Sequence, residues 1–238
     1  MGTVIGKENL NQYLTLIGEG PTGLEKWEQN LKASIGQAEG RSCVILNANP
    51  FTIGQKYLVQ LASSRSTEVL VFVIQGRPES GAKGNHENTG IEFPFENRLK
   101  MVKDGLSDLR NFTVLPSGPY LISRSDFPKS FLSQDLGSVP AHAVLDSMVL
   151  CHICRSLGIK TVYAGDEPRD ELSEIHLNAL RQECRNNNIL LKVAERKRVG
   201  EKYITSSLAR QAIADKNIED LKETVAEPTL SYLKELCF

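Results

Sequence analysis

The sequence has almost no net charge, no long apolar run and no dense set of cysteines. Its 238 residues carry 28 basic and 29 acidic side chains, a formal charge of −1, so any anion site must be local. No apolar stretch approaches the ~20 residues that span a bilayer, and residues 1–11 lack the basic and apolar parts of a signal peptide. We therefore expect a cytoplasmic protein that binds neither nucleic acid nor membrane.

The cysteines are too few and too scattered to form a disulfide framework. They are odd in number, which fits reduced thiols and predicts no disulfides: Cys43, Cys151, Cys154, Cys184 and Cys237. Cys151 and Cys154 form a CxxC without a second pair, so buried helical cysteines are a better interpretation than a metal or redox site.

No repeat or low-complexity segment is visible, and the length suits one compact domain. Residues 1–40 are polar and contain one modest helix near residues 24–35, so we expect an N-terminal extension there. The domain itself is expected over residues 41–216, followed by a C-terminal helical tail over residues 217–238.

Short apolar runs rich in β-branched residues alternate with helical patterns. The runs predict buried strands at residues 43–46, 69–74, 112–115, 161–163 and 189–193. The helices are expected near residues 54–64, 95–109, 141–157, 172–186 and 206–216. This alternation indicates an α/β fold, a Rossmann-like doubly wound parallel sheet of about five strands, with ligands outside the carboxyl ends of the strands.

The turn after the first predicted strand has the composition of a phosphate-binding turn. It reads NANPFTIGQ over residues 47–55. Gly54 permits close approach of a ligand, and the helix that begins there presents free amides and the positive end of its dipole. Thr52 and Gln55 add neutral donors. A helix cap preceded by a proline turn is the alternative interpretation.

A second cluster, ITSSLAR over residues 204–210, precedes the last predicted helix. Its hydroxyls suit a helix start, where free amides bind either a capping oxygen or a phosphate. Arg210 lies four residues after Ser206 and so projects from the same helix face. A plain capping box is the alternative.

Together these two clusters resemble the nucleotidylyltransferase superfamily, and within it the citrate lyase ligases. Those proteins read NANPFTLGH at the first turn and ISASxVR at the second cluster. Further similarity is carried by residues 95–118, by YLISRSDFP at residues 120–128, which resembles DYxISRATFP, and by GDEP at residues 165–168, which resembles GxEP. The resemblance identifies residues 41–216 as a nucleotidylyltransferase-like ligase domain.

The resemblance implies an ATP-dependent reaction in two steps. Acetate attacks the α-phosphate of ATP, pyrophosphate leaves, and the acetyl-adenylate passes its acetyl group to a thiol. In the family that thiol belongs to a coenzyme-A-like prosthetic group on the acyl-carrier subunit of citrate lyase. Mg²⁺ bridging the phosphates is expected.

The resemblance also assigns roles to residues. Thr52, Gly54 and Gln55 are expected near the α- and β-phosphates, and Ser206, Ser207 and Arg210 over the β- and γ-phosphates. Arg124 is expected to bind a phosphate or the acyl acceptor, with a surface salt bridge as its alternative. Gly165 and Asp166 are candidates for adenine or ribose contact, with a tight turn capped by Asp166 as the alternative. The expected catalytic residues are Thr52, Gln55, Arg124 and Arg210, and the expected nucleotide-binding residues are Asn49, Pro50, Phe51, Thr52, Gly54, Gln55, Gly165, Asp166, Ile204, Ser206, Ser207 and Arg210.

The chain departs from the family pattern in three places. Gln55 replaces a histidine, so a neutral donor stands where a charged one is usual; for the neighbouring Lys56 a solvated helix surface is the favoured interpretation. The region before residue 41 is shorter than in the family, and residues 76–92 form a long loop, either a lid or an insertion. A phosphopantetheine-type adenylyltransferase and a nucleotide-binding protein without catalysis remain alternatives.

Overall fold

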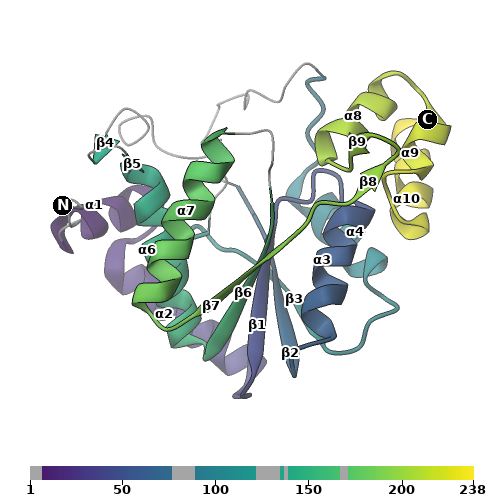
Figure 1. Ribbon diagram of the computed structural model, residues 1–238. Helices are drawn as coiled ribbons and strands as arrows, with labels where there is room; N and C mark the ends of the chain where they lie inside the picture. Colours follow the sequence, from purple (N-terminus) through teal and green to yellow (C-terminus); the bar gives the residue numbers. More distant parts are fainter. Residues whose placement is uncertain (1–6, 77–88, 122–134, 137–138, 167–170) are drawn as a thin grey trace.

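The computed structural model describes residues 7–76, 89–121, 135–136, 139–166 and 171–238. Its centre is a five-stranded sheet in the order β3-β2-β1-β6-β7, in which every pair of neighbours is parallel (Figure 1). The predicted parallel α/β sheet is therefore confirmed, with strand ends shifted by one or two residues. The strands are β1 (Arg41–Leu46), β2 (Glu68–Val73), β3 (Phe112–Pro116), β6 (Ile159–Gly165) and β7 (Leu190–Ala194).

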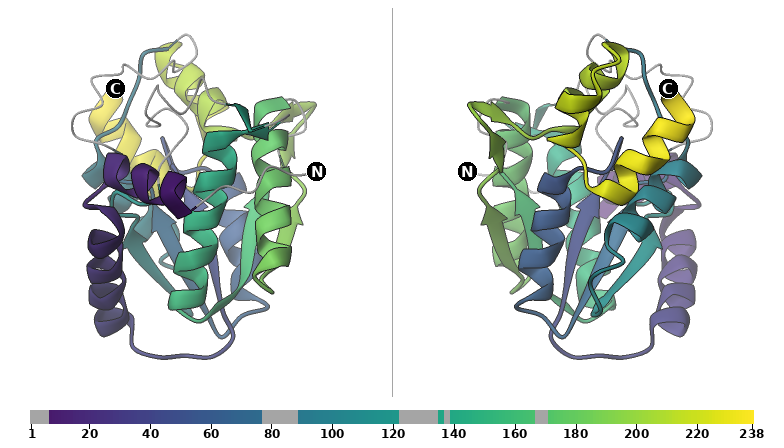
Figure 2. Two further views of the ribbon diagram at one scale, coloured as in Figure 1. Left: turned by 90° about the vertical axis from the view of Figure 1, so that its left-hand side faces the viewer. Right: turned by 90° about the vertical axis from the view of Figure 1, so that its right-hand side faces the viewer.

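Helices cover both faces of the sheet, as the two side views show (Figure 2). Alternation along the strands explains this, because Cys43 of β1 belongs to the hydrophobic core on one face and Val44 to the core on the other. One face is covered by α1 (Lys7–Ile17), α2 (Gly20–Ile35), α6 (Ala141–Ser156) and α7 (Glu171–Asn186). The other is covered by α3 (Ile53–Ser63), α4 (Phe95–Gly105), α8 (Ser206–Ala214), α9 (Ile218–Lys222) and α10 (Glu227–Cys237).

The strand order reverses between β1 and β6. From β1 the chain builds outward through β2 and β3, then returns to the other side of β1 to add β6 and β7. In open parallel sheets such a reversal opens a crevice at the carboxyl ends of the two strands, where ligands bind. Leu46 ends β1 and Gly165 ends β6, so both strand ends lie at that crevice.

The N-terminal segment is built into the core rather than laid on its surface. Tyr13, Leu14, Ile17, Leu24 and Leu31 of α1 and α2 are buried in the same hydrophobic cluster as Leu70 and Phe72 of the sheet. The helix over residues 7–17 was not expected from the sequence. The domain boundary at residue 40 stays a prediction, but residues 7–35 share the core of the sheet.

Two small antiparallel ribbons complete the structure, β4 (Asp135–Leu136) with β5 (Val139–Pro140), and β8 (Arg198–Val199) with β9 (Lys202–Tyr203). The second ribbon leads directly into α8. Within the described ranges, no helix is both long and apolar enough to cross a membrane.

Candidate active site at the ends of β1 and β6

The turn after β1 is closed by a reciprocal cap between Thr52 and Gln55. Thr52 is the N-cap of α3, and its Oγ1 accepts a hydrogen bond from the Gln55 backbone nitrogen at 3.3 Å. The Gln55 side-chain Oε1 accepts in return from the Thr52 nitrogen at 3.0 Å. The capping interpretation of this stretch is thus correct as a description of local structure.

The cap decides what Gln55 presents to a ligand. Its amide oxygen is held by the Thr52 backbone, so the Nε2 group is the part of the side chain left to donate to an anion. The side chain is half-buried at the start of α3, beside the positive end of the helix dipole. Capping and anion binding are therefore compatible at this residue.

The residues before Thr52 are buried and support the turn. The Asn49 side-chain Oδ1 accepts from the Phe93 backbone nitrogen at 3.0 Å, and the Asn49–Pro50 peptide bond is cis. Phe51 is fully buried and packs so tightly on Gly105 that a Cβ there would lie 2.7 Å from its ring. Of Phe51, only the backbone can face a nucleotide.

Helix α8 begins with its own cap. Thr205 is the N-cap, and its Oγ1 accepts from the Leu208 backbone nitrogen at 2.9 Å. Leu208 occupies the position where a capping box needs Glu or Gln, so the predicted alternative of a full box is wrong. Because Thr205 does the capping, the half-buried hydroxyls of Ser206 and Ser207 are not needed for it.

Two hydrogen bonds tie the start of α8 to the turn after β1. Ser206 Oγ donates to the Pro50 carbonyl oxygen at 2.9 Å, and Arg210 Nη1 donates to the Asn49 carbonyl oxygen at 2.6 Å. Arg210 is 6% exposed, and its Nη2 also donates to Ser207 Oγ at 3.0 Å. Ile204 packs on Gly54, with 3.6 Å between its atoms and a Cβ placed there. The structure thus brings the two predicted clusters together.

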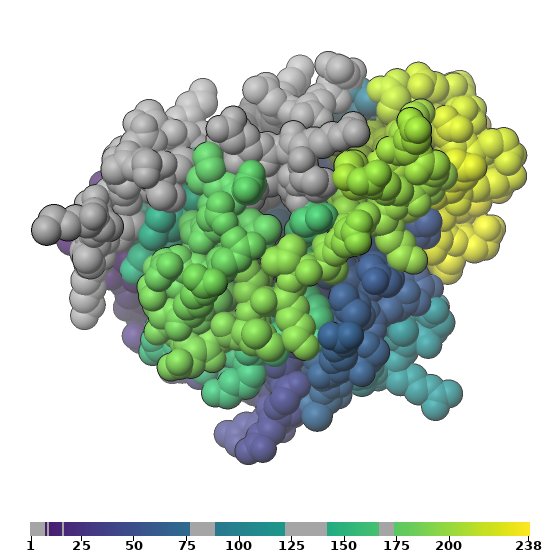
Figure 3. Space-filling view, in the orientation of Figure 1, coloured from purple at the N-terminus to yellow at the C-terminus, as the bar shows by residue number. Residues whose placement is uncertain are grey.

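The segment between β7 and α8 also packs against α3. It crosses the front of the molecule beside α3, as the light-green and blue atoms of Figure 3 show. Lys197 Nζ lies 4.4 Å from the centroid of the Tyr57 ring on α3, a cation–π contact between the two segments.

The end of β6 completes the candidate site. Gly165 is the last residue of β6, and a Cβ placed on it would meet no atom of the described residues within 4 Å. The Asp166 side-chain Oδ1 accepts from the Arg196 backbone nitrogen at 2.8 Å, which joins the ends of β6 and β7. Asp166 therefore ties two strand ends together. A Cβ on Gly165 would therefore have free space among the described residues.

Other expected residues lie elsewhere. Arg124, most of the YLISRSDFP segment and residues 77–88 of the long loop fall outside the described residues. Lys56 pairs with Asp108 at 2.8 Å, and that ion pair lowers the pKa of Asp108 below its usual range. Lys56 is thus engaged by Asp108, although its side chain is only 19% exposed and so is not the solvated surface residue that was expected.

One residue of the site region was missed by sequence reasoning. Arg98 of α4 is 5% exposed and hydrogen-bonds backbone oxygens at the ends of β1 and β2. Its sequence context, FENRLK, marks it only as one more polar residue of an amphipathic helix. Its partners are backbone carbonyl groups, which every residue carries, so no sequence pattern predicts these hydrogen bonds.

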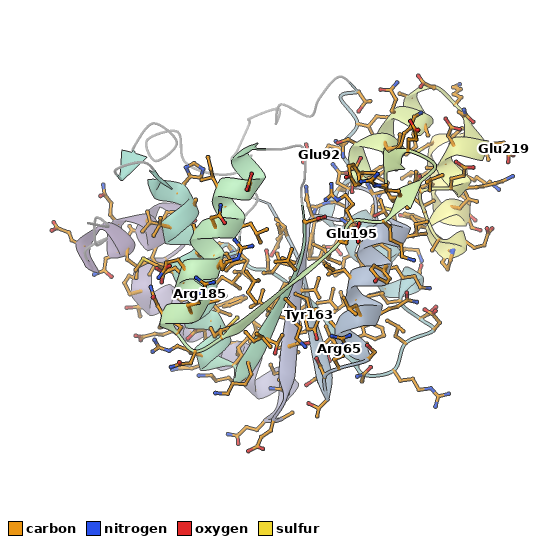
Figure 4. All side chains as sticks on the ribbon, viewed as in Figure 1. Arg65, Glu92, Tyr163, Arg185, Glu195 and Glu219 are labelled. Atoms are coloured by element: carbon orange, nitrogen blue, oxygen red, sulfur yellow. The ribbon has the colours of Figure 1, made fainter. Side chains whose placement is uncertain are left out.

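The carboxylates near the site do not form a metal centre by themselves. Figure 4 places Glu92 and Glu195 on the side of the molecule where the strands have their carboxyl ends. Among the described residues, no group of three or more His, Cys, Asp or Glu side chains is arranged to hold a metal ion. A Mg²⁺ ion at this site would take most of its ligands from phosphate oxygens and water, which is its usual preference.

The CxxC cysteines lie inside the hydrophobic core. Cys151 and Cys154 are buried, with Sγ–Sγ distances of 3.9 Å to Cys184 and to Cys43, respectively. Hydrogen bonding to Cys184 and burial raise the pKa of Cys151. A thiol that stays protonated is a poor nucleophile and a poor metal ligand, so these cysteines act as small core residues.

Comparison with known proteins places the chain in a family. The model of the citrate lyase ligase C-terminal domain matches residues 41–233. The chain belongs to the citrate lyase ligase family. The match includes β1 and its turn as well as the start of α8, the two segments that the structure joins.

Curated citrate lyase ligases are similar over nearly the whole chain. The "[Citrate [pro-3S]-lyase] ligase" of Haemophilus influenzae is 27% identical and that of Escherichia coli K12 is 26% identical, each over 94% of this chain. The match covers 65% and 62% of those two proteins, respectively, so the chain spans less than two thirds of their lengths.

The fold also matches a solved enzyme structure. Pantothenate synthetase from Thermus thermophilus aligns with a TM-score of 0.50 at 12% identity, over 88% of this chain and 81% of that one. At this identity the similarity concerns the fold, and it agrees with the nucleotidylyltransferase-type α/β architecture expected from the sequence.

Proposed function

We propose that this chain is an ATP-dependent ligase of the citrate lyase ligase type. It would activate acetate as acetyl-adenylate and transfer the acetyl group to the thiol of the prosthetic group on the citrate lyase acyl carrier. The single observation that carries the proposal is the convergence of the α3 and α8 helix starts at the end of β1, through Ser206–Pro50 and Arg210–Asn49. Two such starts can hold a chain of phosphates.

The residues would act mainly by binding and orienting. In the first step an acetate oxygen forms a bond to the α-phosphorus of ATP, and the bond to pyrophosphate breaks. Backbone amides of α3, the Gln55 amide and Ser206, Ser207 and Arg210 would offset the charge on the phosphate oxygens. Mg²⁺, when bound, would neutralise part of the same charge.

In the second step a thiol sulfur attacks the acetyl carbon, AMP leaves, and the thiol proton is released to solvent or a base. The free space at Gly165 among the described residues supports placing the adenosine part there, because a flat group can lie against backbone that carries no side chain. Asp166 holds the strand ends that border this space.

A second candidate is a nucleotide-binding protein without turnover. It is favoured by Gln55, whose neutral amide is a weaker partner for a charged transition state than the imidazolium of the family pattern. Such a protein would still bind the nucleotide through the same residues but would not catalyse the transfer to acetate.

Pyrophosphate release separates these candidates. Purified protein with ATP, Mg²⁺ and acetate should release pyrophosphate, and acetyl transfer should then require an acyl carrier that bears the CoA-like thiol. Release with phosphopantetheine but not with acetate would replace the ligase by an adenylyltransferase. ATP binding without release under either condition would select the binding protein.

A further inference from the structure

Arg98 is a buried cation whose guanidinium donates hydrogen bonds to backbone carbonyl oxygens at the carboxyl end of the sheet. Its Nη1 donates to the Asn47 carbonyl oxygen at 2.7 Å, to Asn47 Oδ1 at 3.1 Å and to the Ile74 carbonyl oxygen at 2.7 Å. Its Nε donates to the Phe93 carbonyl oxygen at 3.0 Å, and its Nη2 reaches that of Gln75 at 3.4 Å. One side chain thus holds the residues that follow β1 and β2 and the segment before α4.

These oxygens matter because of where they lie. Asn47 directly follows β1, and Ile74 and Gln75 directly follow β2, so their carbonyls belong to the edge of the sheet that faces the crevice. Carbonyl oxygens carry partial negative charge and repel an anion at close range. A guanidinium bound to them offsets that charge and keeps them from pointing at a ligand.

Arg98 also fixes the path of the turn. Ala48 has a φ of 52°, in the left-handed region that non-glycine residues rarely adopt, and it lies between two residues held by arginines. The Asn47 carbonyl is held by Arg98 and the Asn49 carbonyl by Arg210. The turn that leads into α3 is therefore clamped from α4 on one side and from α8 on the other.

We propose that Arg98 is a positioning residue for the phosphates of the nucleotide: it shapes the turn after β1 and removes carbonyl charge from the edge of the sheet, without touching the ligand. This role rests on the function proposed above. It explains why a charged side chain is buried in α4 beside the site.

Arg41 provides a matched control on the same strand. It begins β1 at the opposite edge, is 3% exposed, and also binds backbone oxygens: Nη1 donates to the Gly36 carbonyl at 2.9 Å and Nη2 to that of Ile35 at 2.7 Å, while Nε pairs with Glu68 at 2.7 Å. Arg41→Met therefore removes a comparable buried guanidinium far from the crevice.

The experiment measures dissociation constants of adenosine, AMP, ATP and inorganic tripolyphosphate by calorimetry. Arg98→Met, Arg98→Lys and Arg41→Met are compared with the wild-type chain at a temperature where far-UV circular dichroism shows each to be folded. We expect Arg98→Met to raise the ATP dissociation constant about tenfold while that of adenosine changes less than about twofold. Arg98→Lys should fall between, because three ammonium donors cannot serve five acceptors.

Arg41→Met should lower the melting temperature and leave all four constants near their wild-type values. An equal loss for adenosine and ATP, or no loss for ATP, in the Arg98 variants would overturn the proposal. If Arg98→Met does not fold, the Arg98→Lys comparison decides in the same way. If the wild-type chain binds tripolyphosphate but not ATP, the proposed function fails and the tripolyphosphate constants decide the role of Arg98. Binding of neither would overturn both.

Discussion

Arg210 of α8 and Asn49 of the turn after β1 are joined by a hydrogen bond of 2.6 Å from Nη1 to the carbonyl oxygen. The two residues are 161 positions apart in the sequence. This contact, with Ser206 on Pro50, turns two separate helix starts into one candidate phosphate site. It also means that Arg210 would serve both the fold and the proposed ligand.

Arg210→Lys should therefore weaken both stability and ATP binding. A lysine cannot donate to the Asn49 carbonyl and Ser207 Oγ with the same forked geometry, so buried acceptors lose partners, at a cost of about 1–3 kcal/mol of unfolding free energy. The ATP dissociation constant should rise about tenfold. Chemical denaturation and calorimetry measure the two effects.

Gln211→Ala is the control for Arg210, since Gln211 is exposed on the same helix and its side-chain Nε2 donates to the Asp215 carboxylate. It should change neither quantity beyond about 0.5 kcal/mol. Wild-type ATP affinity in Arg210→Lys would show that Arg210 serves the fold alone.

The sequence predicts the centre of the sheet well because β1 and β2 are buried on both faces. Runs such as CVIL and VLVFV have no polar alternation to confuse the assignment, and the turns after them carry the motif residues. The missed parts depend on partners distant in the sequence. Helix α1 has its apolar spacing at Leu10, Tyr13, Leu14 and Ile17, but within a polar segment that spacing becomes meaningful only against the sheet.

The site was predictable to the same extent. The hydroxyl-rich start of α8 and the NPFT turn were each open to a plain capping interpretation, and the resemblance joined them into one candidate phosphate site. The structural role of each residue did not follow from the sequence. Thr205 rather than Ser206 caps α8, Asp166 joins the ends of β6 and β7, and Arg98 binds backbone carbonyl oxygens. Each of these outcomes depends on three-dimensional neighbours, and the order of residues does not specify them.

Gln55→Glu should separate capping from nucleotide binding. A glutamate at this position still accepts from the Thr52 nitrogen and adds negative charge at the helix start, so stability should stay equal or rise by about 0.3–1 kcal/mol. In the proposed site the same charge would face the phosphates, and the ATP dissociation constant should rise at least about tenfold. Unchanged ATP affinity in Gln55→Glu would place the phosphates away from α3.

Lys56→Met supplies the neighbouring control. Lys56 pairs with Asp108 at 2.8 Å, so its loss should cost less than about 1 kcal/mol of stability and leave ATP affinity unchanged. Gln55→His tests turnover: a gain in pyrophosphate release would show that the neutral amide limits the reaction, and no gain or a loss would mark Gln55 as an adapted residue.

Leu24→Ala should destabilise the whole chain, because α2 is part of the core. Leu24 is 4% exposed in the cluster that also contains Leu70 and Phe72 of the sheet. Loss of its side chain should cost about 2–5 kcal/mol of unfolding free energy. Glu25 is the next residue and is exposed, so Glu25→Ala should change the free energy of unfolding by less than about 0.5 kcal/mol.

Removal of residues 1–40 tests the same feature more severely. Without α1 and α2, one face of the sheet loses part of its cover, and the shortened chain should bind a hydrophobic dye and unfold without a cooperative transition. A truncated chain with wild-type cooperativity would mean that these helices are dispensable for the fold.

The contact between α2 and α6 should make stability depend on pH through His152. Hydrogen bonding to Glu28 raises the pKa of His152, and the two side chains lie 3.4 Å apart. The folded state then holds a proton that the unfolded state releases. The stabilisation is full below the ordinary histidine pKa and is lost as pH rises through the folded value.

Burial raises the pKa of Asp146 to about 7, so this carboxyl also makes stability fall as pH rises, over the range between its ordinary value and 7. The test of His152 is therefore the difference between wild type and Glu28→Gln in denaturation from pH 5.5 to 8.5, a range that brackets the ordinary histidine value of about 6.5. Glu28→Gln keeps an oxygen to accept from Ser156 Oγ but carries no charge. This substitution should reduce the pH dependence of stability that comes from His152 and leave the pH dependence from Asp146 unchanged. Identical pH profiles for the two proteins would show that Glu28 does not hold the proton on His152.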